Sequence, residues 1–333
     1  MKFMLIFPMF LLASIADGSA LFDDNSILEV TLIGPISTLI KHRHTPEEYE
    51  FMITANGVSR QVRARARGNS RLVVCPFPPI RLNFDKSEPK GTIFAEEGKL
   101  KLVTHCRSGN EDSQDSILNE YTAYRIFNLI SDKSYRVRLL RIRYEDTDGK
   151  QKKLEEPYYG YVIESDESLA ERFGGSLVNI SEVHYSELDM EQTARLSIFQ
   201  YLLGNKDWSL VTAEGKDTCC HNIDLFGING ALTPIPYDFD LATLTFANYR
   251  TNHALVRSKH RVYRGYCRTP DEAVESAIVQ VQALKSQIMD AIRDIPVRNE
   301  RTRERRRIFA AEYFDEAADT DALVTKIRQK CVP

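Results

Sequence analysis

The sequence predicts an α+β protein with a strand-rich first part and a mainly helical second part. Short runs of alternating apolar and polar residues, separated by turn residues, dominate as far as about residue 165. Beyond that point apolar residues recur at helical spacing. No internal repeat or low-complexity linker interrupts the 333 residues. We therefore expect two lobes, at 21–165 and 166–333, after a separate N-terminal segment at 1–20.

The composition is that of a folded soluble protein. Hydrophobic residues make up 43% of the chain and charged residues 27%, which argues against disorder. The formal net charge is only −3. A protein that reads nucleic acid usually carries a basic field, so we expect no nucleic-acid partner.

The N-terminal segment predicts export. One lysine precedes an apolar run from Phe3 to Ile15, and Gly18 and Ala20 stand at the −3 and −1 positions of a cleavage site. This pattern is typical of a secretory signal peptide, since the run is too short to span a bilayer comfortably. The alternatives are an uncleaved anchor or a buried helix. No later segment approaches membrane-spanning length, so we expect a secreted, periplasmic or otherwise extracytoplasmic protein with no integral membrane segment after cleavage.

The six cysteines are an even number, which is compatible with disulfides in an oxidising compartment. Their connectivity cannot be derived from the sequence. The candidate pairs are Cys75 with Cys106 and Cys220 with Cys267. Cys219 and Cys220 are expected not to pair with each other, because a normal disulfide prefers a larger Cα separation than neighbouring residues have.

The first part contains runs typical of strands. They read EYEFMIT, VSRQVRARAR, PIRLNFD, KLKLVTH, RVRLLRIRY and YYGYVIES. Asn56-Gly57 lies between the first two and is a strong hairpin signal. In the second run Arg63, Arg65 and Arg67 alternate with apolar residues and therefore share one face. That face is either solvated or directed at an anion.

The run at 116–130 predicts an amphipathic helix with a carboxylate inside its apolar stripe. The stripe consists of Ile117, Tyr121, Tyr124 and Phe127. Glu120 lies within it, and a carboxylate on an apolar face is costly unless it is paired. Lys99 and Lys101 on the preceding strand are the candidate partners. The alternative is that Glu120 lies at the wet edge of the stripe.

The second part combines predicted helices with polar loops. The helical runs are ESLAERFG, MEQTARLSIFQYLLGN, DEAVESAIVQVQALKSQIMDAIRDI and the C-terminal tail. Gly204-Asn205 is a fitting stop for the second helix, and Asp207 follows directly. IDLF and TPIPY resemble a short hairpin closed by GING. Such a hairpin would bring Asn222 and Asp238 to the same end.

These polar residues form the inventory that phosphoryl transfer needs. One carboxylate orients or deprotonates the attacking hydroxyl, while an asparagine and a second carboxylate hold magnesium. A lysine pinned by a glutamate holds the nucleotide phosphates. Each residue taken singly is a weak signal. The ordered set is more specific, and it reads Lys101, Glu120, Asp207, Asn222 and Asp238.

Several of these segments together resemble the CotH spore-coat kinase family, an atypical protein-kinase-like group with exported relatives. The matching segments span Arg67 to Asp240 and occur in family order; they are RGNSR (67–71), IRLNFDK (80–86), LNEYTAYRIFNLI (118–130), YYGYVIESDESLAERFG (158–174) and GNKDWS…HN…PIPYDFD (204–240). The resemblance implies a two-lobed protein-kinase-like fold, with the strand-rich part as the N-terminal lobe.

The resemblance also implies roles for individual residues. Asp207 would be the catalytic acid, Asn222 and Asp238 metal ligands, and Asp240 the second acid of an aromatic-flanked D-x-D element at the metal. The implied activity is transfer of the γ-phosphoryl of ATP to Ser or Thr hydroxyls of a protein substrate, with Mg²⁺ or Mn²⁺. Lys101, Glu120, Arg81 and Arg67 would bind the nucleotide.

The chain departs from the kinase pattern in three respects. Fifteen positions separate Asp207 from Asn222, against about five in ordinary kinases. One strand position that is a lysine in the family has no lysine here, so the lysine role is divided between Lys101 and Arg81. No G-x-G-x-x-G covers the phosphates, and the loop at 67–71 is the candidate substitute, through its arginines and backbone N–H groups.

These departures leave two other functions open. The first is a catalytically inactive kinase-like binding module. The second is a metal-dependent sugar transferase that uses Asp238-Phe239-Asp240 on a nucleotide sugar. Trp208, beside Asp207, is expected to be a packing residue.

Overall fold

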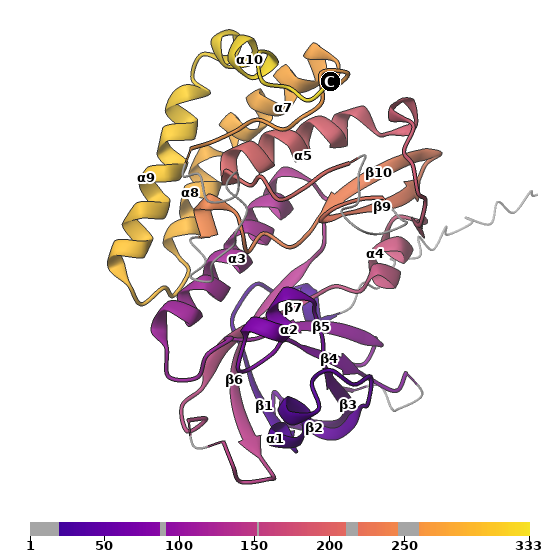
Figure 1. Ribbon diagram of the computed structural model, residues 1–333, viewed down its shortest axis with the longest axis vertical. Helices are drawn as coiled ribbons and strands as arrows, with labels where there is room; N and C mark the ends of the chain where they lie inside the picture. The colour runs from indigo at the N-terminus through magenta and orange to yellow at the C-terminus, as the bar shows by residue number, and fades with distance from the viewer. Residues whose placement is uncertain (1–19, 87–90, 152, 211–218, 246–259) are drawn as a thin grey trace, which may run out of the picture.

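The computed structural model describes residues 20–86, 91–151, 153–210, 219–245 and 260–333. The predicted signal peptide, apart from Ala20, lies outside the described residues. Figure 1 shows the strands of the first part gathered at one end of the molecule, the helices of residues 271–328 at the other, and the helix of residues 111–130 running between them.

The strands of the first part close into a barrel in the order β1-β2-β3-β4-β5-β7-β6. β1 closes it, because it pairs antiparallel with β2 and parallel with β6. The strands are β1 (Leu28–Gly34), β2 (Tyr49–Ala55), β3 (Val58–Ala66), β4 (Ile80–Asn83), β5 (Lys99–Val103), β6 (Val137–Asp146) and β7 (Tyr158–Ile163). A second sheet has the order β10-β9-β8, with β8 (Ser176–Val178), β9 (Ile223–Ile228) and β10 (Ala231–Pro236).

This closure contradicts the predicted fold class. A two-lobed protein-kinase-like fold with a strand-rich N-terminal lobe is wrong, because the strands of the first part form a closed seven-stranded barrel. The physical reason lies in LEVTLIG at 28–34, which was not recognised as a strand. In the structure Leu28 pairs with Leu140 and Val30 with both Ile142 and Ala55, so both neighbouring strands gain a partner. A barrel of this kind has no free edge.

The predicted hairpin at Asn56-Gly57 is confirmed. β2 and β3 are antiparallel with Ala55 opposite Val58. Asn56 and Gly57 have φ values of 51° and 76°, the left-handed conformation that a two-residue hairpin turn of type I′ requires at both positions.

The helices follow the predicted periodicity with one difference. The run at 271–295 is two helices, since α7 ends at Ala283 and α8 begins at Lys285. The helices are α1 (Ile36–Lys41), α2 (Ser70–Val74), α3 (Glu111–Ile130), α4 (Asp166–Arg172), α5 (Met190–Leu203), α7 (Asp271–Ala283), α8 (Lys285–Arg293), α9 (Glu300–Glu316) and α10 (Thr320–Arg328).

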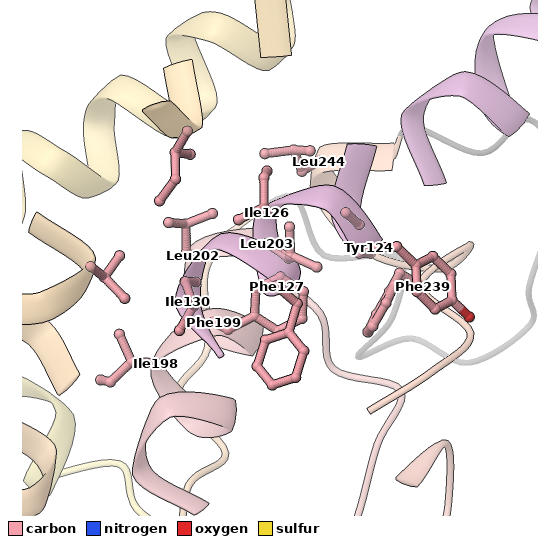
Figure 2. Packing of buried hydrophobic residues seen from close by; sticks show 14 of the residues in the cluster. Tyr124, Ile126, Phe127, Ile130, Ile198, Phe199, Leu202, Leu203, Phe239 and Leu244 are labelled. Atoms are coloured by element: carbon pink, nitrogen blue, oxygen red, sulfur yellow. The ribbon is translucent and has the colours of Figure 1, made fainter. Parts of the chain in front are cut away.

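An aromatic core joins α3, α5 and the segment after β10, as Figure 2 shows. Phe127 of α3 and Phe199 of α5 have ring centroids 4.7 Å apart. Phe239 packs edge-on against Phe199 at 5.2 Å and against Tyr124 at 4.6 Å. Phe239 is completely buried, so this core fixes the short segment on which Asp238 and Asp240 lie.

The structure contains three disulfides among the described residues. The predicted Cys75–Cys106 pair is confirmed. The other two predictions are wrong, because Cys219 pairs with Cys220 and Cys267 with Cys331. The rule that excluded the neighbouring pair assumes an ordinary Cα separation, whereas these two Cα atoms lie 3.1 Å apart. Disulfides of this number fit a protein of an oxidising, extracytoplasmic compartment.

No helix in the described ranges is both long enough and apolar enough to cross a membrane.

Candidate functional site

The predicted catalytic residue follows the end of α5. The helix stops at Gly204, whose φ of 63° provides the left-handed cap that glycine favours. Asn205 is buried, and its Oδ1 accepts the backbone N–H of Asp207 at 3.0 Å. The next residue, Trp208, is 2% exposed and packs with Leu210 and its neighbours. This confirms the prediction that Trp208 is a packing residue.

Asp207 is held by the two residues that precede β9. The side-chain amide of Asn222 donates to the backbone oxygen of Asp207 at 2.7 Å and to its Oδ2 at 3.0 Å. Nε2 of His221 lies 3.0 Å from the other carboxylate oxygen. The role of His221 was missed, because a lone histidine before an asparagine gives no pattern in the sequence. These two side chains fix the orientation of the Asp207 carboxylate.

The hairpin predicted from IDLF and TPIPY is confirmed. Ile223 pairs with Pro236 in the antiparallel ladder of β9 and β10. The backbone N–H of Tyr237 donates to the oxygen of Asn222 at 3.1 Å. Asn222 and Asp238 therefore lie at the same end of the hairpin, although sixteen positions separate them. The side chain of Asp238 is exposed, and its backbone N–H donates to the Tyr124 hydroxyl at 3.0 Å.

A cavity of about 840 Å³ brings the barrel and this hairpin together. Of the residues that the sequence singles out, it is lined by Arg67, Arg81, Lys101, Glu120, Asn222, Asp238 and Asp240. Asp207 contacts two lining residues, His221 and Asn222. The cavity is also lined by Arg65 of the alternating run and Arg71 of the loop at 67–71. Further lining residues, which the sequence did not single out, include Tyr135, Asp166 and Asp224.

One wall of the cavity carries a row of cations on three adjacent strands. Arg65 of β3 stands opposite Arg81 of β4, and Arg81 stands opposite Lys101 of β5. Like charges directly opposite each other destabilise a sheet. Nε of Arg81 is buried and has no hydrogen-bond partner in the described part of the chain. This row is the arrangement that an anionic ligand would stabilise.

Arg67 directly follows β3 and lines the same cavity as the row. Burial lowers the pKa of Arg67, while the nearby Asp238 carboxylate acts in the opposite direction. Arg63 differs, since it is exposed and its Nε lies 3.6 Å from Oε2 of Glu48. Of the alternating arginines of this strand, two therefore face the cavity and one faces solvent.

The predicted pairing of Lys101 with Glu120 is wrong. Nζ of Lys101 bonds to Oδ1 of Asp166 at 2.9 Å. The hydroxyl of Tyr135 lies 2.9 Å from the same oxygen and 2.5 Å from Oδ2 of Asp224. Burial raises the pKa of Asp224. The partner of Lys101 is thus Asp166.

Glu120 is paired instead with Arg71 of α2. Nη2 of Arg71 donates to Oε2 of Glu120 at 2.5 Å, and its Nε donates to Oδ2 of Asp240 at 3.2 Å. All three side chains are buried. Burial raises the pKa of Glu120, and the Arg71 guanidinium opposes that rise. Burial, reinforced by Asp238, raises the pKa of Asp240 well above its ordinary value.

The residues at this site fit a divalent cation whose other ligands are nucleotide phosphates. The described residues contain no group of three or more histidine, cysteine, aspartate or glutamate side chains arranged to hold a metal. Mg²⁺ in nucleotide sites is held by one or two carboxylates together with the phosphates. Asp238 and the amide oxygen of Asn222 match that smaller requirement. Oδ2 of Asp240 is already bonded to Arg71.

Comparisons with known proteins add little. No protein-family model matches the chain, and no curated protein matches it in sequence. One similar solved structure is the Helicobacter pylori proinflammatory kinase CtkA, with 10% sequence identity and a TM-score of 0.38 over 86% of this chain and 93% of that one. A similarity of this extent adds nothing to the argument from the residues. The resemblance to the CotH family stays a prediction.

Proposed function

We propose that this protein is a phosphotransferase that moves the γ-phosphoryl of ATP to a Ser or Thr hydroxyl of a protein substrate. One observation carries the proposal. The cation row of Arg65, Arg81 and Lys101 faces the same cavity as the Asn222–Asp238 end of the hairpin, which holds Asp207. A phosphate-binding wall opposite an oriented carboxylate is the arrangement that phosphoryl transfer uses.

Different residues of the cavity would bind the nucleotide and activate the attacking hydroxyl. Arg81 and Arg65 would bind the triphosphate, because guanidinium groups donate in a planar fork that matches phosphate oxygens. Asp207 would accept the proton of the attacking hydroxyl. Asn222 and His221 hold its two carboxylate oxygens at 3.0 Å each, so the base is oriented before substrate arrives.

Asp238 and Asn222 would hold a bound Mg²⁺ or Mn²⁺, which would neutralise charge on the phosphates. A sugar transferase is disfavoured, since Asp240 bonds Arg71 and the D-x-D element cannot present both carboxylates freely. The disulfides and the predicted signal peptide support action outside the cytoplasm.

The test is transfer of label from γ-labelled ATP. The protein without residues 1–20 is incubated with Mn²⁺ and a Ser- and Thr-rich acceptor. We expect labelling of the acceptor or of the protein itself, and a rate at least about 100-fold lower for Asp207→Asn, because general-base catalysis contributes about that much.

Asp319→Asn is the matched control. Asp319 caps α10 far along the chain from the cavity, and asparagine caps helices equally well. The control should keep the wild-type rate. Equal rates for wild type and Asp207→Asn would contradict the proposal, as would release of nucleotide from a nucleotide sugar with none from ATP.

A further inference from the structure

The segment from Asp238 to Asp240 is fastened to α3 at two points. The Tyr124 hydroxyl accepts the backbone N–H of Asp238 at 3.0 Å. One turn earlier on the same helix, Glu120 reaches Asp240 through the guanidinium of Arg71. The two anchors lie on either side of the buried Phe239. The segment therefore has little freedom to move.

Arg71 makes a contact that no lysine could reproduce. Its Nη2 and Nε bond carboxylates from two different parts of the chain, 49 and 169 positions away. A guanidinium presents donors in a fixed planar fork, whereas an ammonium is a single point charge. The Arg71 side chain is only 10% exposed, so its position is determined by these partners and by the fold.

Asp238 has a conformation that needs such support. Its φ is 58°, a left-handed backbone that is uncommon for residues other than glycine. Such conformations cost free energy and persist when the surroundings determine them. The exposed carboxylate of Asp238 is directed from this backbone at the cavity, which it lines.

We propose that Arg71 is a positioning residue that holds Asp240 and Glu120 so that Asp238 is presented to the metal–nucleotide complex, and that Asp240 is an anchor. The inference rests on the proposed function for its ligand. It replaces two expectations from the sequence. Asp240 acts through Arg71 and not as a metal ligand. Arg71 takes the place of the lysine that was expected to pair with Glu120.

The sign of a charge effect makes the inference testable. Removing a positive charge near a cation site should strengthen cation binding if only Coulomb's law acts. Removing a positioning residue should weaken it, and loss of such a supporting contact costs about 10- to 100-fold in metal affinity. Arg71→Met separates the two effects, because a charge effect alone would raise the Mn²⁺ affinity, whereas loss of positioning would lower it.

The experiment is a Mn²⁺ titration by electron paramagnetic resonance, with a non-hydrolysable ATP analogue present. We expect Arg71→Met to lower the apparent Mn²⁺ affinity by about 10-fold or more, with circular dichroism confirming the fold. If Arg71→Met does not fold, Arg71→Lys carries the test, since it keeps the charge and loses the fork. We expect it to weaken Mn²⁺ binding by about 3- to 10-fold.

Arg60→Lys is the matched control. Arg60 is also a buried arginine that bonds two groups, the backbone oxygens of Phe94 and Asp85, but it does not line the cavity. This variant removes the planar set of guanidinium donors from a buried position in the barrel. It should leave Mn²⁺ affinity within about twofold of wild type, which separates a local role from general destabilisation.

Asp240→Asn distinguishes an anchor from a ligand. If Asp240 and Arg71 act as one unit, Arg71→Lys/Asp240→Asn binds Mn²⁺ no more weakly than the worse single variant. Additive losses would mean that Asp240 ligates the metal and would overturn the inference. Unchanged or tighter binding by the Arg71 variants, or no Mn²⁺ binding by wild type, would also overturn it. Normal Mn²⁺ binding without phosphoryl transfer would instead refute the proposed function alone.

Discussion

Two buried charge clusters in this protein have opposite composition. At the cavity, one arginine, Arg71, is shared by two carboxylates, those of Glu120 and Asp240. At the end of β7, one carboxylate, Glu164, is shared by two arginines, Arg136 at 3.0 Å and Arg172 at 2.8 Å. Glu164 is completely buried, as Glu120 nearly is.

The difference indicates what each cluster is for. The Glu164 cluster is formally neutral, because Nη1 of Arg136 also lies 3.5 Å from Oδ1 of Asp23. Glu164 accepts the backbone N–H of Arg136 as well, at 3.1 Å. It joins the start of β6 to α4 and does not line the cavity. The Arg71 cluster has a formal charge of −1 when both of its carboxylates are ionised, and it stands beside Asp238. Buried negative charge beside the cation row of Arg65, Arg81 and Lys101 would favour a divalent cation between them. The first cluster therefore stabilises the fold, and the second prepares a site.

The largest expected effect comes from neutralising the shared carboxylate of the stabilising cluster. Glu164→Gln leaves Arg172 without its carboxylate partner and Arg136 with only the exposed Asp23, and we expect a loss of about 3 kcal/mol in the free energy of unfolding. Glu120→Gln leaves the pair of Arg71 and Asp240 balanced, so about 1 kcal/mol should be lost. Urea denaturation of both variants measures the difference.

The activities of the two variants should fall in the reverse order. The folded fraction of Glu164→Gln should keep its phosphoryl-transfer rate, whereas Glu120→Gln should be slower because the anchor of Asp240 is weakened. If Glu164→Gln costs no more stability than Glu120→Gln, the division between a stabilising cluster and a site cluster is wrong.

A smaller effect should appear in the dependence of stability on pH. Burial raises the pKa of Asp240 from its ordinary value of 3.8. Between the ordinary pKa of 3.8 and the raised pKa of the folded state, Asp240 of the folded protein binds a proton that it does not bind in the unfolded chain. This contribution to stability is therefore present below the ordinary pKa and is lost as the pH rises through the folded-state value. A whole proton is worth about 1 kcal/mol per pH unit.

Asp240→Asn removes that titration. We expect the stability of wild type relative to Asp240→Asn to decrease as the pH is raised from about 5 to about 8. Urea midpoints of the two proteins at each pH measure it. Parallel curves would mean that Asp240 does not titrate differently in the folded and unfolded states.

Local signals in the sequence were sufficient for elements whose geometry is set by neighbouring residues. Asn56-Gly57 and the GING turn each determine a hairpin through left-handed backbone conformations. Gly204 ends α5 for the same reason. The second hairpin alone places Asn222 beside Asp238, which is why part of the candidate site could be predicted.

Contacts between distant segments could not be predicted. Barrel closure depends on a parallel pairing of 28–34 with 140–146, more than a hundred positions apart, and nothing local marks it. The sequence favours a lysine of the preceding strand as the partner of Glu120, but Arg71 reaches it from the short helix α2. The alternation of Arg65 with apolar residues placed it on one face, and only the fold shows that this face lines a cavity.

A crystal structure of the protein without residues 1–20, bound to a non-hydrolysable ATP analogue and Mn²⁺, would test the proposed nucleotide site directly. We expect a triphosphate along Arg65 and Arg81, with the cation between Asn222 and Asp238 and the γ-phosphate facing Asp207. A nucleotide bound elsewhere, or a cation held by Asp240 with Arg71 displaced, would contradict it.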